Sequence, residues 1–357
     1  MMRFIVALFI PLLTPLAAAS ADLDAVVAAQ LALHKIPSIS VAQIEGGKVI
    51  RVAAWGDQAP GVKATPRTLY NIASMTKPLA AEAMLRLVVN GKASLDEPMA
   101  NWWVDPDIAS DPRREKLTLR IALSHQTGFA NWRFIDGGKL RFLRDPGTHF
   151  GYSGEGFEYA ARYTEKRVGK DFEALAIAQI FKPLGMKETA LTRRTWFEGR
   201  IAPPTQKDGT VLAPTIREYF KFSAADDGYT TPSDYARFLI SMLWPDRIGR
   251  KVARERNRMQ VSAKDQACEG ARINICPDDV GWGLGWAMMR SGDHEIYWHG
   301  GNDKGEATIG WWEPTTGRGG VILTNSAAGD AAFPDIMAAM GADPALVKFL
   351  RGYTKGP

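Results

Sequence analysis

Alternating apolar and polar residues mark both ends of the chain. Near the N-terminus, residues 38–45 and residues 49–55 alternate with a period of two, and Gly46-Gly47 separates them. This pattern predicts a β-hairpin. Four further strand-like segments, separated by turn residues, lie in the last quarter of the chain: residues 281–289, 295–299, 307–312 and 319–324.

The middle of the chain has a different pattern. From about residue 80 to residue 260, helical periodicity dominates, with loops that contain glycine and proline between the helices. Helices are also expected at residues 22–34 and 330–350. The end strands then form one antiparallel sheet flanked by helices, with a mostly helical subdomain inserted between them. The predicted fold class is α/β (α+β), with a catalytic cleft where the two parts meet.

The N-terminal segment has the features of an export signal. A short positive region precedes an apolar run over residues 4–16, and Ala19-Ser20-Ala21 fits the small-residue cleavage rule. We expect residues 1–21 to be a signal peptide, residues 22–350 a single catalytic domain and residues 351–357 a C-terminal tail. The mature protein is then periplasmic or secreted, without a stable membrane anchor.

The composition and the cysteine content limit which partners and cofactors are expected. The 357 residues are 46% hydrophobic and 23% charged, which is typical of a globular protein with a sizeable core. The net charge of +5 comes without a nucleic-acid-binding motif, so no nucleic acid partner is expected. Cys268 and Cys276 are expected to form a disulfide that closes a surface hairpin. Neither has a second ligand at metal-binding spacing, and no cofactor motif occurs, so no metal or cofactor is expected.

The segment Ser74-Met75-Thr76-Lys77 carries the first candidate chemistry. A serine hydroxyl needs a base within hydrogen-bond reach to act as a nucleophile. Residues three apart share a helix face, so Lys77 could lie beside the Ser74 oxygen at the start of a largely buried helix. The alternative is an ordinary helix start, in which Ser74 is the cap and Lys77 is solvated.

Two later motifs accompany this segment. Tyr152-Ser153-Gly154 follows a turn in the helical region, and His299-Gly300-Gly301 closes a strand near the C-terminus. In this order the motifs resemble those of the β-lactamase-like serine hydrolases. That group includes class C β-lactamases, DD-carboxypeptidases, D-aminopeptidases and β-lactamase-fold esterases. The resemblance covers nearly all of the chain after the signal segment.

The resemblance implies roles for the matching residues. Ser74 would form the acyl-enzyme, and Lys77 would keep Ser74 deprotonated or shuttle its proton. Tyr152 would pass a proton between Ser74, the leaving group and water. His299 would belong to the catalytic set, and the backbone N–H groups of Ser74 and Asn302 would bind the oxyanion.

The same resemblance implies substrate contacts at Gly154, Gly300 and Gly301, but two positions depart from the usual pattern. Gly154 stands where β-lactamases and penicillin-binding proteins carry an asparagine, so it is expected to open space beside the nucleophile. His299 replaces a lysine that attracts a carboxylate. Both departures favour an esterase, or a peptidase with an altered pocket. The expected partner is a small-molecule ester, amide or peptide substrate.

Several alternatives stay open. A DD-carboxypeptidase, a D-aminopeptidase or a weak β-lactamase would use the same chemistry, and a catalytically idle binding protein would share only the fold. An α/β-hydrolase with Ser153 as nucleophile would need a glycine at Glu155. His294, Glu295 and His299 resemble a zinc motif, but their spacing is one residue too long. His125 is expected to hold a loop near the cleft.

Overall fold

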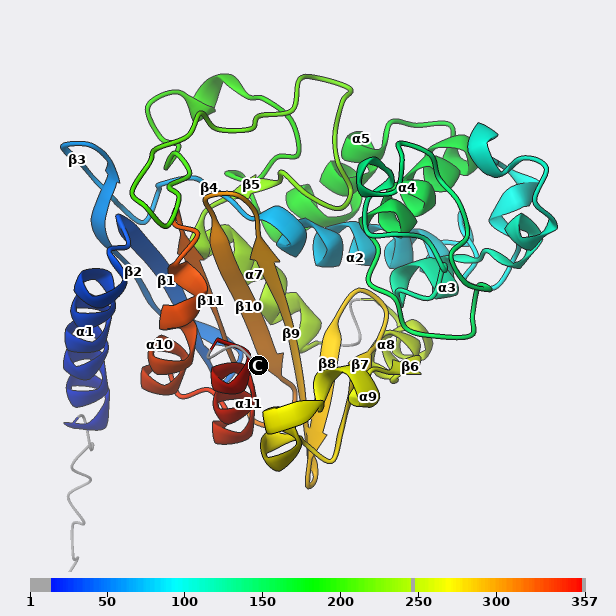
Figure 1. Ribbon diagram of the computed structural model, residues 1–357. Coiled ribbons are helices and arrows are strands. Elements are labelled where there is room, and N and C mark those ends of the chain that lie inside the picture. The colour runs from blue at the N-terminus through cyan, green and yellow to red at the C-terminus, as the bar shows by residue number, and fades with distance from the viewer. Residues whose placement is uncertain (1–13, 245–247, 355–357) are drawn as a thin grey trace, which may run out of the picture.

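A nine-stranded antiparallel sheet forms the centre of the computed structural model, which describes residues 14–244 and 248–354 (Figure 1). The strand order is β3-β2-β1-β11-β10-β9-β8-β7-β6, so the first strand of the chain pairs with the last. The prediction that the two ends of the chain build one sheet is therefore confirmed. The strands of this sheet are β1 Ser38–Glu45, β2 Lys48–Ala59, β3 Val62–Lys63, β6 Val261–Ser262, β7 Asp279–Trp282, β8 Ala287–Ser291, β9 His294–Asn302, β10 Ala307–Glu313 and β11 Arg318–Thr324.

Helices cover both faces of the sheet. In Figure 1, α1, α10 and α11 lie on one face, while α7 packs against β1, β10 and β11 on the other. Residues 80–260 were predicted to form the inserted helical subdomain. They form that subdomain and also provide α7, which covers one face of the sheet. A separate pair, β4 Tyr70–Asn71 and β5 Tyr229–Thr230, joins the start of this interval to its end. The α-helices are α1 Thr14–His34, α2 Thr76–Val89, α3 Leu119–Leu123, α4 Gly154–Val168, α5 Phe172–Ala176, α6 Lys182–Leu184, α7 Pro232–Met242, α8 Arg250–Asn257, α9 Lys264–Ala267, α10 Phe333–Ala339 and α11 Pro344–Thr354.

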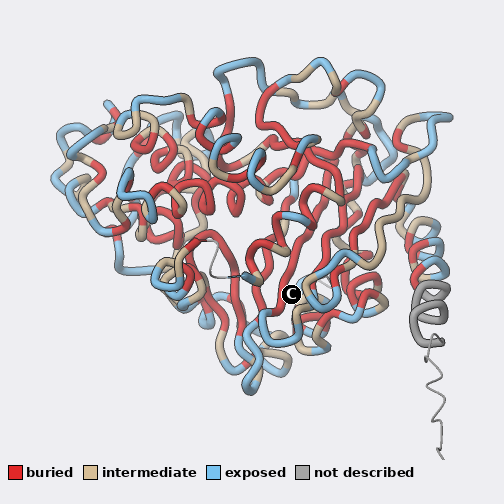
Figure 2. The backbone as a smooth tube through the Cα atoms, turned by 180° about the vertical axis from the view of Figure 1, so that it is seen from behind, coloured by how far each residue is buried: buried red, intermediate tan, exposed pale blue. Residues whose placement is uncertain are grey.

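The central strands are buried on both faces (Figure 2). Successive side chains of a strand point to opposite faces. Leu323 of β11 accordingly packs with the helical part, while its neighbour Ile322 packs with α1 and the C-terminal helices. The adjacent residues Trp311 and Trp312 of β10 divide in the same way. Two cores, one on each face, thus fix the position of the sheet.

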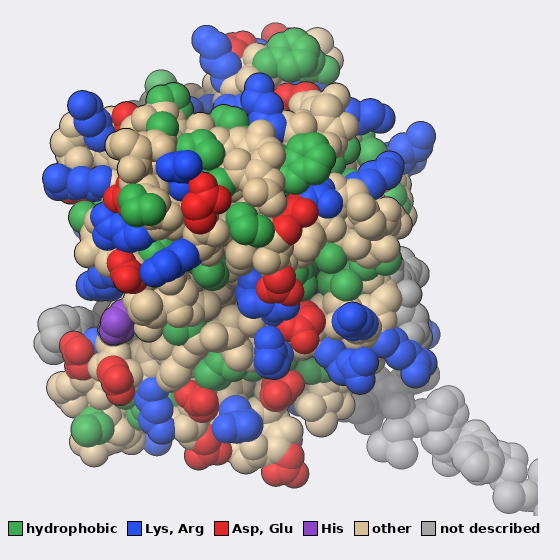
Figure 3. Space-filling model, turned by 90° about the vertical axis from the view of Figure 1, so that its right-hand side faces the viewer, with side chains coloured by type: hydrophobic (Ala, Val, Ile, Leu, Met, Phe, Trp, Pro, Cys, Tyr) green, Lys and Arg blue, Asp and Glu red, His purple; other side chains and the backbone are tan. Residues whose placement is uncertain are grey.

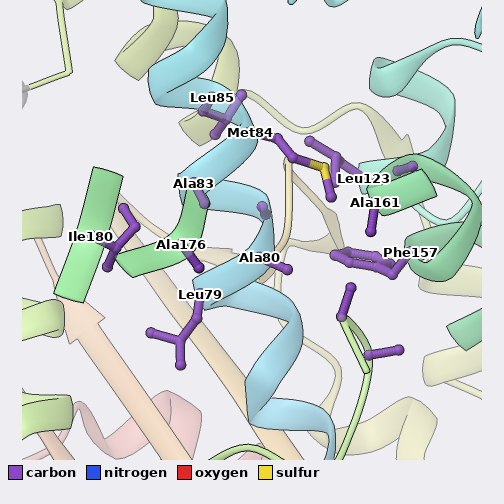
Figure 4. Packing of buried hydrophobic residues seen from close by; sticks show 14 of the residues in the cluster. Leu79, Ala80, Ala83, Met84, Leu85, Leu123, Phe157, Ala161, Ala176 and Ile180 are labelled. Carbon is purple, nitrogen blue, oxygen red and sulfur yellow. The ribbon is translucent and has the colours of Figure 1, made fainter. Parts of the chain in front are cut away.

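Helix α2 is the core of the inserted part. Nearly every side chain along it is buried, as expected for a helix that is apolar all round. In Figure 4, its Ala80 and Met84 lie on the side of Leu123 and Phe157, which belong to α3 and α4, while Leu79 lies on the opposite side of α2, toward Ala176 and Ile180. Fully burying a leucine or phenylalanine contributes about 1.5–3 kcal/mol, so this packing fixes the residues at the start of α2 firmly.

Three predicted segments differ from the observed ones. The single strand predicted at 281–289 is two strands, β7 and β8, because Gly285 has a φ of +86° and turns the chain against α2. The helix predicted at 330–350 is interrupted at Gly341, which has a φ of +79°. Helix α11 continues to Thr354, so the described part of the expected C-terminal tail, residues 351–354, is helical.

The cysteine prediction is confirmed, but its setting differs. Cys268 and Cys276 form a disulfide, with Cα atoms 5.5 Å apart. It joins the end of α9 to the 3-10 helix Gly270–Ile275, so it closes helical turns and not a hairpin. Of the predicted signal peptide, residues 1–13 lie outside the described residues, and the backbone of the rest begins α1. None of the described helices combines the length and apolar content of a membrane span.

Candidate active site

Ser74 lies in a strained turn before α2. The 3-10 helix Ala73–Met75 leads directly into α2, so Ser74 precedes the α-helix on which the sequence placed it. Ala73 has a φ of +43°, a left-handed conformation that costs a non-glycine residue about 1–2 kcal/mol. The side chain of Asn71 accepts a hydrogen bond from the Ala73 N–H (2.8 Å) and supports this turn. Strained backbone of this kind is typical of functional sites.

Lys77 reaches the Ser74 oxygen. Its Nζ atom donates to Ser74 Oγ (2.9 Å) and to the carbonyl oxygen of Ala225 (2.8 Å). The Lys77 side chain is 0% exposed, whereas Ser74 is partly exposed. The structure therefore contradicts the alternative of a solvated Lys77 beside a capping serine. It shows a desolvated amine on a hydroxyl that solvent can reach.

Tyr152 completes the group around Lys77. It lies in the loop before α4, and its ring centroid is 4.9 Å from Lys77 Nζ. The next residue, Ser153, is buried, donates to the Ala130 carbonyl and accepts from the Gly156 N–H. Ser153 is therefore the cap of α4, which excludes it as an exposed nucleophile.

His125 supports Tyr152 from below. The two rings stack with centroids 4.2 Å apart, and His125 Nδ1 accepts a hydrogen bond from the Ser153 N–H (3.1 Å). This acceptor role places the His125 proton on Nε2. Burial, with the nearby Lys77 charge, holds the pKa of His125 well below its usual range. His125 therefore has the expected structural role, because its imidazole orients the loop that carries Tyr152.

His299 faces the same group of residues as a neutral imidazole. Its ring centroid lies 6.2 Å from that of Tyr152, and the side chain is 2% exposed. Nδ1 lies 2.7 Å from the Gly300 carbonyl oxygen and must donate to it, which leaves Nε2 as an acceptor. Nε2 is buried and has no partner in the described structure. Burial, and then the Lys77 charge, lowers the pKa of His299 to about 3.

The glycines of the third motif lie on opposite faces of β9. A Cβ atom on Gly301 would lie 2.2 Å from the Ile72 carbonyl oxygen and 3.1 Å from the Met75 nitrogen, so only glycine fits there. The close approach at Gly301 is therefore to the turn that carries Ser74. Gly300 lines a cavity of about 310 Å³ beneath the C-terminal helices, on the other face. Any contact of these two residues with substrate stays a prediction.

Gly154 does not open space beside the nucleophile. A Cβ atom here would lie 2.7–2.9 Å from three ring carbons of Trp132. The expectation of an open position is wrong, because the indole occupies the space. The contact joins the loop that carries Trp132 to the first residue of α4.

The two predicted oxyanion donors lie on neighbouring elements of the fold. Asn302 is the last residue of β9, and β9 packs against the turn that contains Ser74. The backbone N–H groups of Ser74 and Asn302 therefore belong to neighbouring segments. Their action on an oxyanion stays a prediction.

Buried carboxyl groups lie close to this site. Asp226 follows the carbonyl that binds Lys77, and its pKa is raised to about 7 by burial and then by Asp227. Burial, followed by the charge of Asp303, raises the pKa of Glu306 to about 8.

Residues 14–244 and 248–354 contain no group of three metal-ligating side chains. His294 pairs with Asp343, so the zinc-like spacing does not form a site.

A large cavity lies away from this site. Its volume is about 850 Å³, and it lies beside β2 and β3 against the loop around residues 193–219. It does not contact Ser74, Lys77 or Tyr152.

Over the side of the helical part shown in Figure 3, basic and acidic side chains are interspersed.

Residues 23–341 match the Beta-lactamase family. The chain belongs to this family. Its members are generally serine hydrolases, and the Ser74–Lys77–Tyr152 arrangement described above agrees with such chemistry. The resemblance inferred from the motifs is thereby confirmed.

Several proteins are similar to this chain at low identity. The D-alanyl-D-alanine-carboxypeptidase/endopeptidase AmpH of Escherichia coli (strain K12) is 24% identical over 66% of this chain and 65% of its own length. Esterase EstB of Burkholderia gladioli is 25% identical, over 54% and 58%. Penicillin-binding protein 4 of Amycolatopsis lactamdurans is 24% identical, over 85% and 84%. The chain thus spans less than two thirds of the length of AmpH and of EstB.

The fold has a counterpart among solved structures. The octameric penicillin-binding protein homologue from Pyrococcus abyssi superposes with a TM-score of 0.75 at 20% identity. The match covers 91% of this chain and 78% of that one. The α/β fold with its large antiparallel sheet is therefore that of the penicillin-binding proteins.

Proposed function

We propose that this protein is an esterase-like serine hydrolase that acts through an acyl-enzyme on Ser74. The observation that carries the proposal is the hydrogen bond from the buried Lys77 amine to the Ser74 hydroxyl. The Tyr152 ring lies 4.9 Å from the same amine, which supports a role for Tyr152 in carrying the proton from Ser74 to the leaving group. A catalytically idle binding protein has no need for this arrangement.

The reaction has two matched halves. The Ser74 proton passes to Lys77 in its neutral amine form, directly or through the Tyr152 hydroxyl, while Oγ bonds to the substrate carbonyl carbon and the N–H groups of Ser74 and Asn302 bind the oxyanion. The bond to the leaving group then breaks, and Tyr152 returns the proton to the departing oxygen or nitrogen. In the second half, a water molecule loses its proton to the same pair and releases the acid from Ser74.

Two features support esters over β-lactams and peptides that end in a carboxylate. His299 is buried and neutral, and its free Nε2 is an acceptor, so it offers a carboxylate neither a charge nor a donor. Gly154 offers no side-chain amide for an acylamino group. Each missing polar contact costs about 1–3 kcal/mol, so the two together lower β-lactam turnover by roughly two to four orders of magnitude. A simple ester needs neither contact.

A peptidase is the second candidate, because AmpH and penicillin-binding protein 4 are among the relatives. It needs a cation other than His299 to hold a terminal carboxylate. A substrate panel separates the candidates: nitrophenyl esters, a chromogenic cephalosporin and D-amino acid amides, each with wild type and Ser74→Ala. We expect the highest kcat/KM for an ester and none with the variant. A higher kcat/KM for the cephalosporin or an amide would overturn the ester preference.

We also propose that the protein is exported, as its N-terminal sequence indicates. The disulfide between Cys268 and Cys276 supports this, because such bonds persist in oxidising compartments. Mass analysis of the purified extracytoplasmic protein should give an N-terminus near Asp22. A full-length chain recovered only from the cytoplasm would contradict export.

A further inference from the structure

Trp132 fills the space that any side chain at position 154 would need. Its ring atoms lie 2.7–2.9 Å from where a Cβ atom on Gly154 would be, closer than real Cβ contacts allow. Only glycine at 154 is therefore compatible with the ring in this place. The two residues form a matched pair, although they are far apart along the sequence.

The loop that carries Trp132 is tied to the start of α4. The Asn131 side chain accepts from the Gly154 N–H (2.9 Å), and the Asn131 carbonyl accepts from the Glu155 N–H (3.0 Å). The residue after Trp132 is also bonded to α4, because the Arg133 N–H donates to Glu155 Oε1 (2.9 Å). The indole is thus held between two residues that are both bonded to α4.

Ion pairs strengthen this attachment. The Arg133 guanidinium contacts Glu155 and Asp105 (both 2.9 Å) and Asp107 (3.2 Å). The side chains of Asp105 and Glu155 are 8% exposed, so these pairs are largely shielded from water. A tryptophan fixed in this way is a rigid surface and not a mobile flap.

The ring lies beside the reacting groups. Its centroid is 5.7 Å from Lys77 Nζ, the amine that bonds to Ser74. On its outer side, Trp132 stacks with Phe134 at 6.1 Å, and Phe134 is 72% exposed. Trp132 and Phe134, here named the aromatic wall, thus run from the amine beside the nucleophile to the molecular surface.

We propose that Trp132 determines acyl specificity, selecting flat or unbranched apolar acyl groups that lie along the aromatic wall. The proposal rests on the proposed hydrolase function. A polar acylamino group placed against this ring would lose its hydrogen bonds to water without replacement. An alkyl or aryl acyl chain gains apolar contact instead.

The first test compares chain-length preference. Nitrophenyl acetate and octanoate are assayed with wild type, Trp132→Ala and the control Trp102→Ala. Trp102 is a tryptophan of the same helical part whose ring faces Arg167, and it is 47% exposed. We expect the octanoate-to-acetate ratio of kcat/KM to fall about 10–100-fold in Trp132→Ala, the scale of one lost aromatic contact, and to be unchanged in the control. An unchanged ratio in Trp132→Ala would overturn the proposal.

The second test needs no activity, so it separates this proposal from the hydrolase function. Thermal unfolding is measured for Gly154→Ala, Trp132→Ala and the double variant. A Cβ at 154 collides with the ring, so Gly154→Ala should lower Tm clearly when Trp132 is present and little when it is absent. Equal losses of Tm in both backgrounds would show that the ring does not occupy this space. Absence of ester hydrolysis in wild type would instead refute the proposed function.

Discussion

The two sides of the candidate site differ in how they are built. The nucleophile side, formed by Ala73, Ser74 and Lys77, lies on one continuous turn and helix. The recognition side, formed by Trp132, Gly154 and His299, is assembled from three distant segments. Polar, hydrogen-bonded groups make up the first side, whereas an aromatic ring and a neutral imidazole dominate the second. The groups of the proposed attack therefore lie within one local segment, whereas the groups proposed for recognition come from separate segments.

The largest expected effect comes from removing the groups that transfer the Ser74 proton, Lys77 of the nucleophile side and the neighbouring Tyr152. Lys77→Ala and Tyr152→Phe should each lower kcat for a nitrophenyl ester by about two or more orders of magnitude, the usual scale of acid–base catalysis. Because both residues handle the same proton, the double variant should be little worse than the poorer single variant. Steady-state kinetics of all four proteins gives the comparison. Fully multiplicative losses in a folded double variant would argue against a shared proton path.

An intermediate effect concerns two carboxyl groups, Asp226, which lies near Lys77, and Glu306, which lies near Asp226. The folded-state pKa values of Asp226 and Glu306, about 7 and about 8, are raised above their ordinary values. Between about pH 4 and pH 8 the folded protein then holds more protons than the unfolded chain, so stability falls as pH rises through this window. Below the window both states are protonated, and the contribution to stability is fully present.

Thermal unfolding between pH 5 and pH 8 measures this effect. Asp226→Asn with Glu306→Gln should make the change of Tm with pH more positive than in wild type. His125 and His299, whose pKa values are lowered, favour the opposite slope below about pH 6.5, and they do so equally in both proteins. The difference corresponds to roughly 1–4 kcal/mol across the window. Asp208→Asn is a suitable control, because that residue is exposed and has a lowered pKa. An identical slope in wild type and the double variant would contradict the raised pKa values.

The smallest expected effect concerns strain at the nucleophile turn. Ala73→Gly relieves the positive φ, worth about 1–2 kcal/mol, but gives the unfolded chain more freedom, worth about 0.5–1 kcal/mol. The net result should be a gain in the free energy of unfolding of up to about 1 kcal/mol, measured by denaturant titration. Ala83→Gly, in the middle of α2, should instead destabilise by about 1 kcal/mol or more. Destabilisation of similar size in both variants would show that Ala73 is not strained.

The sequence predicted the nucleophile side well because its information is local. The spacing of Ser74 and Lys77 and the apolar residues after them indicate a buried helix start without knowledge of the rest of the fold. Alternation in the end segments likewise predicted the strands of the sheet. The turn at Gly285 was missed, because an apolar run with glycines fits either one strand or two.

The recognition side could not be predicted, since it depends on contacts between distant segments. Nothing in the residues around Gly154 indicates that Trp132 covers it. The charge state of His299 depends on burial and on Lys77, which lies on another element. The carbonyl of Ala225 that binds Lys77 belongs to the backbone, so its position follows from the fold and not from residue type.

The most direct test of the central claim is to trap the acyl-enzyme. The wild-type protein is treated with a fluorophosphonate, and the modified residue is located by peptide mass analysis, with Ser74→Ala as control. The account predicts a single adduct on Ser74, carried by the peptide that also contains Lys77, and no adduct in the variant. An adduct on Ser153, or an active enzyme that takes up no label, would contradict it.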